Sequence, residues 1–129
     1  MKFIALAAAG GAIGAAGRYL VGVYAMRQFG PAFPYGTFIV NVVGALLMGL
    51  VIHSLAVRYT GSTELRTFVA VGILGGFTTF SAFSLEVANM IERGNWSLAA
   101  IYALASVIAT VLALFAGLYL ARQITGVSM

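Results

Sequence analysis

The chain has 129 residues, of which 62% are hydrophobic and 8% are charged, and its mean hydropathy is +1.04. A soluble domain is about 25% charged, so this composition excludes a soluble globular enzyme and a disordered chain. The formal net charge of +4 comes from basic residues spread singly along the chain, which excludes a nucleic-acid-binding patch. Asp and Cys are absent and the only Lys is Lys2, which removes the usual nucleophiles and thiolate metal ligands. What remains is an integral membrane protein with no expected enzymatic activity.

Four apolar segments are each long enough to cross a bilayer, which takes roughly 20 helical residues. We predict an all-α membrane protein with one domain over residues 1–129 and helices over residues 3–26, 35–57, 65–91 and 96–121. The connections are short, so helices that follow one another should run antiparallel. The first segment resembles a signal peptide, but its apolar run continues past Arg18, which favours a retained membrane helix.

The first helix combines small residues with one charge. Gly10 and Gly14 have the spacing that lets helices approach closely in lipid, and Ala45 and Gly49 repeat it on the second helix. Arg18 lies about two-thirds of the way along the first helix. It either attracts anions at a vestibule or extends its side chain to the membrane surface, and its position favours neither interpretation.

The second helix carries two polar residues. Asn41 lies about one turn inside the membrane, where its amide can donate to an anion or join two helices. His53 lies near the end of the helix. We interpret it as a residue of the membrane interface rather than a metal ligand, because no second ligand is spaced near it.

The third helix is predicted to be broken near its middle, where Gly75-Gly76 is followed by Thr78-Thr79. Such a break frees backbone carbonyls inside the membrane, and carbonyls at a helix C-terminal end suit a small cation such as Na⁺. After the break, Phe80 and Phe83 share one helix face. Their positive ring edges can contact an anion, although phenylalanines at this spacing are more often lipid-facing or core residues.

The fourth helix carries hydroxyl groups at a four-residue spacing, on Tyr102, Ser106 and Thr110. This spacing forms one continuous stripe along the helix. The hydroxyls can donate to a dehydrated anion, or they can form hydrogen bonds to neighbouring helices and to their own backbone.

With four spans, both termini lie on the same side of the membrane. That side would hold four basic residues against two on the other, which is a weak signal for cytoplasmic termini. The first group is Lys2, Arg58, Arg66 and Arg122, and the second is Arg27 and Arg93. So small a bias also allows insertion in both orientations, and hence an inverted pair of identical chains. Four helices enclose little space, so we expect function at an interface between chains.

Three motifs carry a resemblance to a known family. They are Gly-Gly-Ala-Ile-Gly-Ala-Ala-Gly-Arg-Tyr at 10–19, Gly-Thr-Phe-Ile-Val-Asn-Val-Val-Gly at 36–44 and Gly-Gly-Phe-Thr-Thr-Phe-Ser-Ala-Phe-Ser at 75–84. In order, length and spacing the chain resembles the Fluc (CrcB) fluoride channels of bacteria over essentially its full length. The third motif is the most specific of the three.

The resemblance implies a dual-topology antiparallel homodimer in the bacterial inner membrane, with two antiparallel pores at the dimer interface that export fluoride passively. It places pore residues at Asn41, Phe80, Phe83, Ser81, Ser84, Tyr102, Ser106 and Thr110. It places vestibule residues at Arg18 and Glu86, and a structural Na⁺ at the dimer centre on the backbone carbonyls of Gly75 and Thr78 from each chain. Ala82 departs from the family, which commonly has Thr there, and this puts in question the conduction rate or the route of the ion near that point.

Two other classes fit a small four-helix membrane protein. A multidrug or cation transporter needs a membrane-embedded carboxylate to couple protons to its substrate, and the only candidate is the off-centre Glu86. A structural subunit of a larger membrane complex would move no ions on its own. Flux through the purified protein distinguishes these classes from a channel.

Overall fold

The computed structural model of the chain describes residues 1–127, and its regular structure there is entirely helical. Four helices are long and apolar enough to cross a membrane: Lys2–Phe29, Tyr35–Arg58, Thr63–Glu92 and Trp96–Thr125. The four predicted spans are therefore confirmed, and each extends at one or both ends beyond the predicted limits. The last two residues of the predicted 1–129 domain lie outside the described residues.

The first, second and fourth spans are the single helices α1 (Lys2–Phe29), α2 (Tyr35–Arg58) and α6 (Trp96–Thr125). The third span is built from four pieces. It begins with α3 (Thr63–Arg66), widens into the π-helical η1 (Thr67–Leu74), returns to α4 (Gly75–Phe77) and resumes after a break as α5 (Phe80–Glu92).

The break in the third span is confirmed, and it lies at Thr78 and Thr79. Both residues are extended, with φ/ψ of −85°/158° and −153°/123°. The two glycines at 75 and 76 instead form the last turn before the break. The Thr79 side chain then caps α5 by accepting a hydrogen bond from the Ala82 N–H at 3.1 Å, which is the usual role of a threonine at a helix start.

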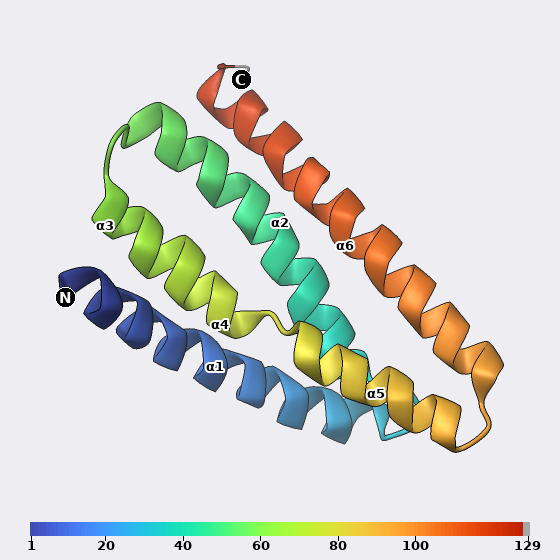
Figure 1. Cartoon of the computed structure of the whole chain (residues 1–129). Helices are drawn as coiled ribbons and strands as arrows, with labels where there is room; N and C mark the ends of the chain where they lie inside the picture. The colour runs from blue at the N-terminus through green and yellow to red at the C-terminus, as the bar shows by residue number, and fades with distance from the viewer. Residues whose placement is uncertain (128–129) are drawn as a thin grey trace.

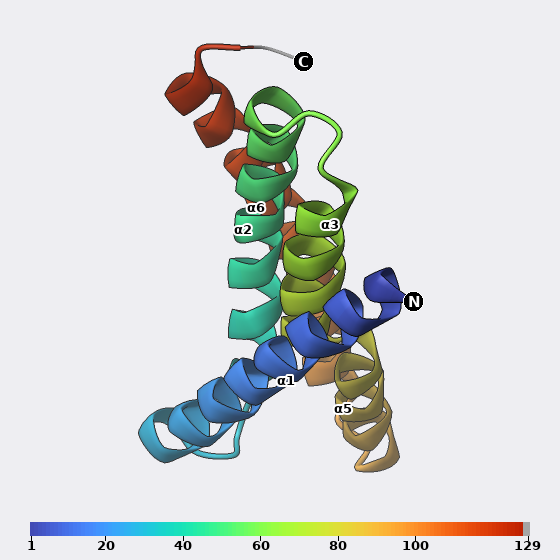
Figure 2. The same cartoon turned by 90° about the vertical axis from the view of Figure 1, so that its left-hand side faces the viewer.

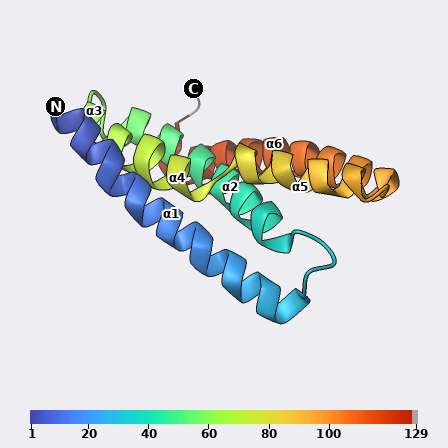
Figure 3. The ribbon, with the colours of Figure 1, turned by 60° about the horizontal axis from the view of Figure 1, so that its bottom comes forward.

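The spans pair in sequence-distant combinations. α2 packs along α6, and α1 packs along η1 and α4 (Figure 1). Below the break, α5 lies beside α6 while α1 diverges from both (Figures 2 and 3). The start of α1 and the end of α6 lie at the same end of the molecule as the connection between α2 and α3, as four antiparallel spans require (Figure 1).

Glycines allow the close approach between α1 and the third span. A Cβ at Gly14 would lie 2.7 Å from the amide nitrogen of Phe77, and one at Gly76 would lie 2.7 Å from the carbonyl oxygen of Gly11. Such distances are shorter than van der Waals contact, so only glycine fits at these two positions. These close approaches confirm the predicted packing role of Gly10 and Gly14 in α1. In lipid, close van der Waals contact of this kind drives helix association.

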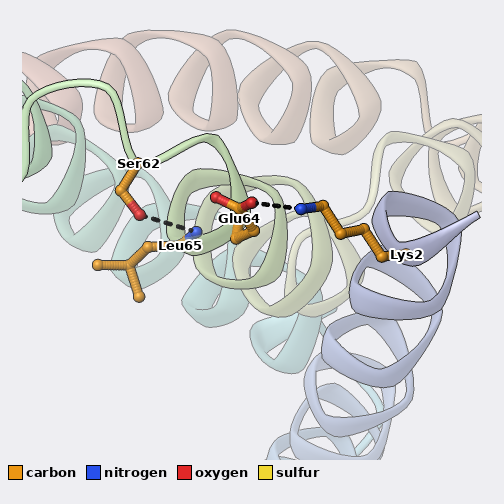
Figure 4. Close-up of polar contacts among 4 residues, drawn as sticks. All are labelled: Lys2, Ser62, Glu64 and Leu65. Carbon is orange, nitrogen blue, oxygen red and sulfur yellow. Dashed lines mark hydrogen bonds and ion pairs between the residues drawn. The ribbon is translucent and has the colours of Figure 1, made fainter.

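At the end of the molecule that carries the N-terminus, one ion pair joins α1 to α3 and one side chain caps α3. The Lys2 ammonium lies 2.8 Å from Glu64 Oε1, and Ser62 Oγ accepts a hydrogen bond from the Leu65 N–H at 3.4 Å (Figure 4). Ser62 therefore caps α3. The ion pair is half exposed, so it contributes little stability on its own.

The chain has a small core and a large apolar surface. The buried cluster consists of Phe83, Met90, Ala99 and Tyr102. Exposed large apolar residues lie on all four spans, and α6 carries many of them. In a membrane protein such a surface faces lipid or another protein chain, since neither requires polar groups.

Candidate ion pathway at the helix break

The groove beside the break, here called the break groove, has a volume of about 420 Å³. It lies between α2, the break with its flanking turns, and α6. The residues that line it are Asn41, Gly75, Thr78, Thr79, Phe80, Phe83, Ser106, Val107, Thr110 and Val111. The structure thus brings together seven of the predicted site residues, which come from three spans. None of the lining residues is charged.

The two phenylalanines of α5 contact each other, with ring centroids 5.3 Å apart and an interplanar angle of 41°. Their environments differ. Phe83 is 9% exposed and packs on the Tyr102 ring, with centroids 5.2 Å apart, whereas Phe80 is 75% exposed. Phe83 is therefore held by the core of its own chain, while Phe80 presents most of its ring to whatever lies beyond the groove.

Ser106 has a buried hydroxyl with no hydrogen-bond partner in the described part of the chain. It lines the break groove together with Thr110, one turn further along α6. Buried polar groups in native proteins are nearly always paired, so an unpaired one calls for an explanation such as a ligand. A hydroxyl that faces a groove can donate to an anion placed there.

Tyr102, the remaining residue of the predicted hydroxyl stripe, does not line the break groove. It is fully buried, and its hydroxyl donates to Glu86 Oε1 at 2.9 Å. The other oxygen of Glu86 accepts a hydrogen bond from Thr37 Oγ1 at 2.9 Å. The stripe is therefore divided between two environments: Ser106 and Thr110 face the groove, and Tyr102 faces a carboxylate.

Thr37 is a site residue that sequence analysis missed. It lies four residues before Asn41 and thus on the same face of α2. The sequence signal that could have identified Thr37 is this four-residue spacing, which also indicated the hydroxyl stripe on α6.

Asn41 lies against the broken backbone itself. Its Nδ2 donates to the Thr79 carbonyl oxygen at 2.9 Å, and its Oδ1 accepts from the Thr79 N–H at 2.8 Å. Arg18 reaches the same region from α1, where its Nε donates to the Gly76 carbonyl oxygen at 3.1 Å. The structure thus gives both polar residues backbone partners in the third span.

A second groove, here called the arginine groove, has a volume of about 530 Å³ and lies on the α1 side of α5. It contains two arginines, Arg18 and Arg27, and it reaches Thr79, which also lines the break groove. Ala82 and Thr37 line it as well. Ala82 therefore lies on the surface of this groove.

Besides Tyr102 and Glu86, the predicted residues Ser81, Ser84 and His53 lie outside both grooves. Ser84 Oγ donates to the Phe80 carbonyl oxygen at 3.0 Å, and Ser81 Oγ lies 3.2 Å from Thr79 Oγ1. His53 is buried against α6, with Nε2 3.0 Å from Thr125 Oγ1. Among residues 1–127, His, Asp and Glu form no group of three that could hold a metal ion.

The backbone at the break offers a different kind of cation site. In a continuous helix the Gly75 carbonyl would accept from the Thr79 N–H, and the Thr78 carbonyl from the Ala82 N–H. These donors instead bind Asn41 Oδ1 and Thr79 Oγ1. Both carbonyls therefore lack their helical donors, and both residues line the break groove. Uncharged carbonyl oxygens of this kind fit Na⁺.

Comparison with known proteins identifies the family. The family model described as "CrcB-like protein, Camphor Resistance (CrcB)" matches residues 5–118. The chain belongs to the CrcB family. Among its relatives, the protein from Caulobacter sp. is 56% identical over 128 residues, covering 98% of this chain and 100% of that protein. The protein from Agrobacterium fabrum is 53% identical over 121 residues, covering 94% and 97% of the two chains. Both are named "Fluoride-specific ion channel FluC".

The CrcB match covers the whole candidate site. Every residue that lines the break groove or the arginine groove lies between residues 18 and 111, inside the matched range. The last turns of α6, which include the His53 partner Thr125, lie beyond it. The resemblance inferred from three motifs is therefore confirmed at the level of the family.

Proposed function

We propose that this chain is a fluoride-specific ion channel of the bacterial inner membrane, through which cytoplasmic fluoride leaves passively. Its membership of the CrcB family and the printed names of its relatives support the ion. The observation that carries the proposal within the molecule is the unpaired buried hydroxyl of Ser106 in the uncharged break groove. It is a hydrogen-bond donor available to an anion in the membrane.

The chemistry of the break groove suits a small, strongly hydrated anion. Fluoride leaves water only where other donors replace its hydration. Ser106, Thr110 and the positive ring edges of the phenylalanines are moderate donors placed in series. A fixed cationic side chain would bind the anion too firmly, whereas conduction requires binding weak enough to allow exit.

Two copies of the chain in opposite orientations are proposed to complete the pathway. One chain leaves Phe80 75% exposed beside the groove, and its α6 presents a broad apolar surface. In the dimer, the break groove of each chain would be closed by the partner, giving two antiparallel pores at the interface. The weak imbalance of basic residues at the two ends of the spans supports insertion in both orientations.

The carbonyls of Gly75 and Thr78 are proposed to hold a structural Na⁺ at the dimer centre, two from each chain. When bound, the ion would supply positive potential near the anion path. Asn41 and Thr79 keep these carbonyls free of helical donors. Their side-chain oxygens bind the N–H groups of Thr79 and Ala82, which in a continuous helix would donate to the two carbonyls. Crystals of the dimer in which Na⁺ is substituted by a heavier monovalent cation test the site; the absence of a central ion would remove it from the proposal.

The arginine groove is proposed as the vestibule. Arg18 and Arg27 there would raise the local concentration of anions without lining the break groove. Glu86 lies near the pathway with its carboxylate engaged by Thr37 and Tyr102. A proton-coupled transporter of cations needs a carboxylate that binds and releases its substrate, and these two contacts do not favour that alternative.

Purified protein in liposomes provides the test of function. Efflux of fluoride from vesicles that contain this chain alone supports the channel and excludes a subunit that depends on other proteins. Uptake of a cationic drug driven by a proton gradient, with no fluoride efflux, would support the transporter instead.

A further inference from the structure

An interrupted helix inside a membrane leaves peptide groups without partners, and each unsatisfied group is costly in hydrocarbon. The third span is interrupted at Thr78 and Thr79. Some of the N–H and carbonyl groups at this break bind side chains of other helices, and the carbonyls that do not are available to ions.

Asn41 binds both the N–H and the carbonyl of Thr79, and the N–H is the group that the break leaves without a helical acceptor. Its amide accepts the Thr79 N–H at 2.8 Å and donates to the Thr79 carbonyl at 2.9 Å. A side-chain amide has the same donor and acceptor as a peptide group. Asn41 thus pairs with Thr79 as a neighbouring strand would, although it comes from a helix 38 positions earlier in the sequence.

Arg18 satisfies a second group from the opposite side. Its Nε donates to the Gly76 carbonyl, which in a continuous helix would accept from the N–H of Phe80. Asn41 lines the break groove and Arg18 lines the arginine groove. The two side chains therefore contact the break from its two sides, from α2 and from α1.

α2 also makes room for this arrangement at Gly44. A Cβ at Gly44 would overlap Thr78 Cγ2. The extended Thr78 can therefore lie against α2 only because position 44 has no side chain, and this brings the break within reach of Asn41, which lies three residues before Gly44.

We propose that Asn41 and Arg18 are positioning residues that hold the third span in its broken form. They occupy the peptide groups of Thr79 and the carbonyl of Gly76, so that the carbonyls of Gly75 and Thr78 remain the ones without donors. Asn41 then has one amide N–H left for an anion, because the other donates to the Thr79 carbonyl. The effect on fluoride flux rests on the proposed function, whereas the effect on the backbone does not.

Hydrogen–deuterium exchange of the purified protein in detergent, followed by mass spectrometry of peptides that cover residues 74–82, tests the proposal. In Asn41→Ala the Thr79 N–H loses its acceptor, and we expect its exchange to rise by roughly tenfold or more. Asn41→Asp keeps an acceptor oxygen and should keep the slow exchange at Thr79 while losing the bond to the carbonyl. Arg18→Ala should speed exchange at residues 76–80 by freeing the end of α4.

Thr110→Val is the matched control for the backbone readout, because Thr110 lines the same groove from α6 and is not one of the two residues, Asn41 and Arg18, whose side chains bind the broken backbone from other helices. Its exchange over residues 74–82 should equal that of the wild type. Unchanged exchange in folded Asn41→Ala and Arg18→Ala proteins would overturn the proposal. If Asn41→Ala does not fold, equal and fast exchange in wild type and Asn41→Asp would overturn it. A wild-type protein that carries no fluoride would refute the proposed function and leave the exchange comparison intact.

Discussion

Phe80 and Phe83 lie one helical turn apart on α5 with their rings in contact, yet one is 75% exposed and the other is 9% exposed. The pair therefore joins the core of the chain to its surface at the edge of the break groove. Phe83 rests on Tyr102, which is fully buried, and Phe80 extends outward from it. In the proposed dimer this outer ring would meet the partner chain.

This difference predicts different outcomes for the same substitution. Phe80→Ile should lower fluoride efflux by roughly tenfold or more, since removing ring-edge contacts worth about 1.4 kcal/mol changes a rate by that factor. Its thermal unfolding should match the wild type. Phe83→Ile should lower efflux and also destabilise the fold by about 1–2 kcal/mol, because it leaves a gap beside Tyr102. Normal efflux in both variants would exclude the phenylalanines from the pore.

Ser106→Ala should reduce fluoride efflux without destabilising the protein. The Ser106 hydroxyl is buried and has no partner in the described residues, so its removal takes away no protein hydrogen bond and should change the free energy of unfolding by no more than about 1 kcal/mol. Efflux from liposomes and thermal unfolding in detergent measure the two effects. A large loss of stability would mean that Ser106 has a structural partner, and unchanged efflux would mean that its hydroxyl does not serve the ion.

Gly14→Ala should destabilise the packing of α1 on the third span. A Cβ at Gly14 would lie within 3 Å of backbone atoms that cannot move aside, and overpacking of this kind costs about 1–3 kcal/mol. Gly11→Ala is the matched control, because its Cβ would meet nothing within 4 Å. Thermal unfolding should therefore fall for Gly14→Ala alone. Equal stability of the two variants would contradict the close approach of these helices.

Arg27→Gln should lower fluoride efflux at low ionic strength and leave it nearly unchanged at high ionic strength. Arg27 lines the arginine groove but not the break groove, so it acts on the ion only through its field, which salt screens over about 10 Å at 0.1 M. Arg58→Gln, at the C-terminal end of α2, removes an equal charge outside both grooves and should have a smaller effect. A loss of efflux that is independent of salt would argue against steering.

Much of the fold could be predicted from the sequence, because local patterns encode it. The four apolar runs predicted the four spans, and the weak helix formers at Gly75-Gly76 and Thr78-Thr79 predicted the break. Its position at the threonines reflects packing: the glycines stay helical against α1, while Thr78 extends into the space that Gly44 leaves. The π-helical η1 had no predicted counterpart.

The candidate site could be predicted only in part, because several of its contacts join distant residues. The spacing on α6 predicted that Ser106 and Thr110 share a face, and both line the break groove. The same spacing could not reveal that Tyr102 turns to Glu86, nor that Arg18 binds the Gly76 carbonyl 58 positions away. Such contacts depend on how the helices pack, which hydropathy and residue spacing do not specify.

Ion selectivity of the purified chain tests the central claim most directly. Liposomes that contain only this protein are loaded with potassium fluoride or potassium chloride, and a potassium ionophore is added to balance the charge that leaves. We predict rapid release of fluoride and no release of chloride above that of protein-free liposomes. No fluoride release, or equal release of the two anions, would contradict the proposal that this member of the CrcB family is a fluoride-specific channel.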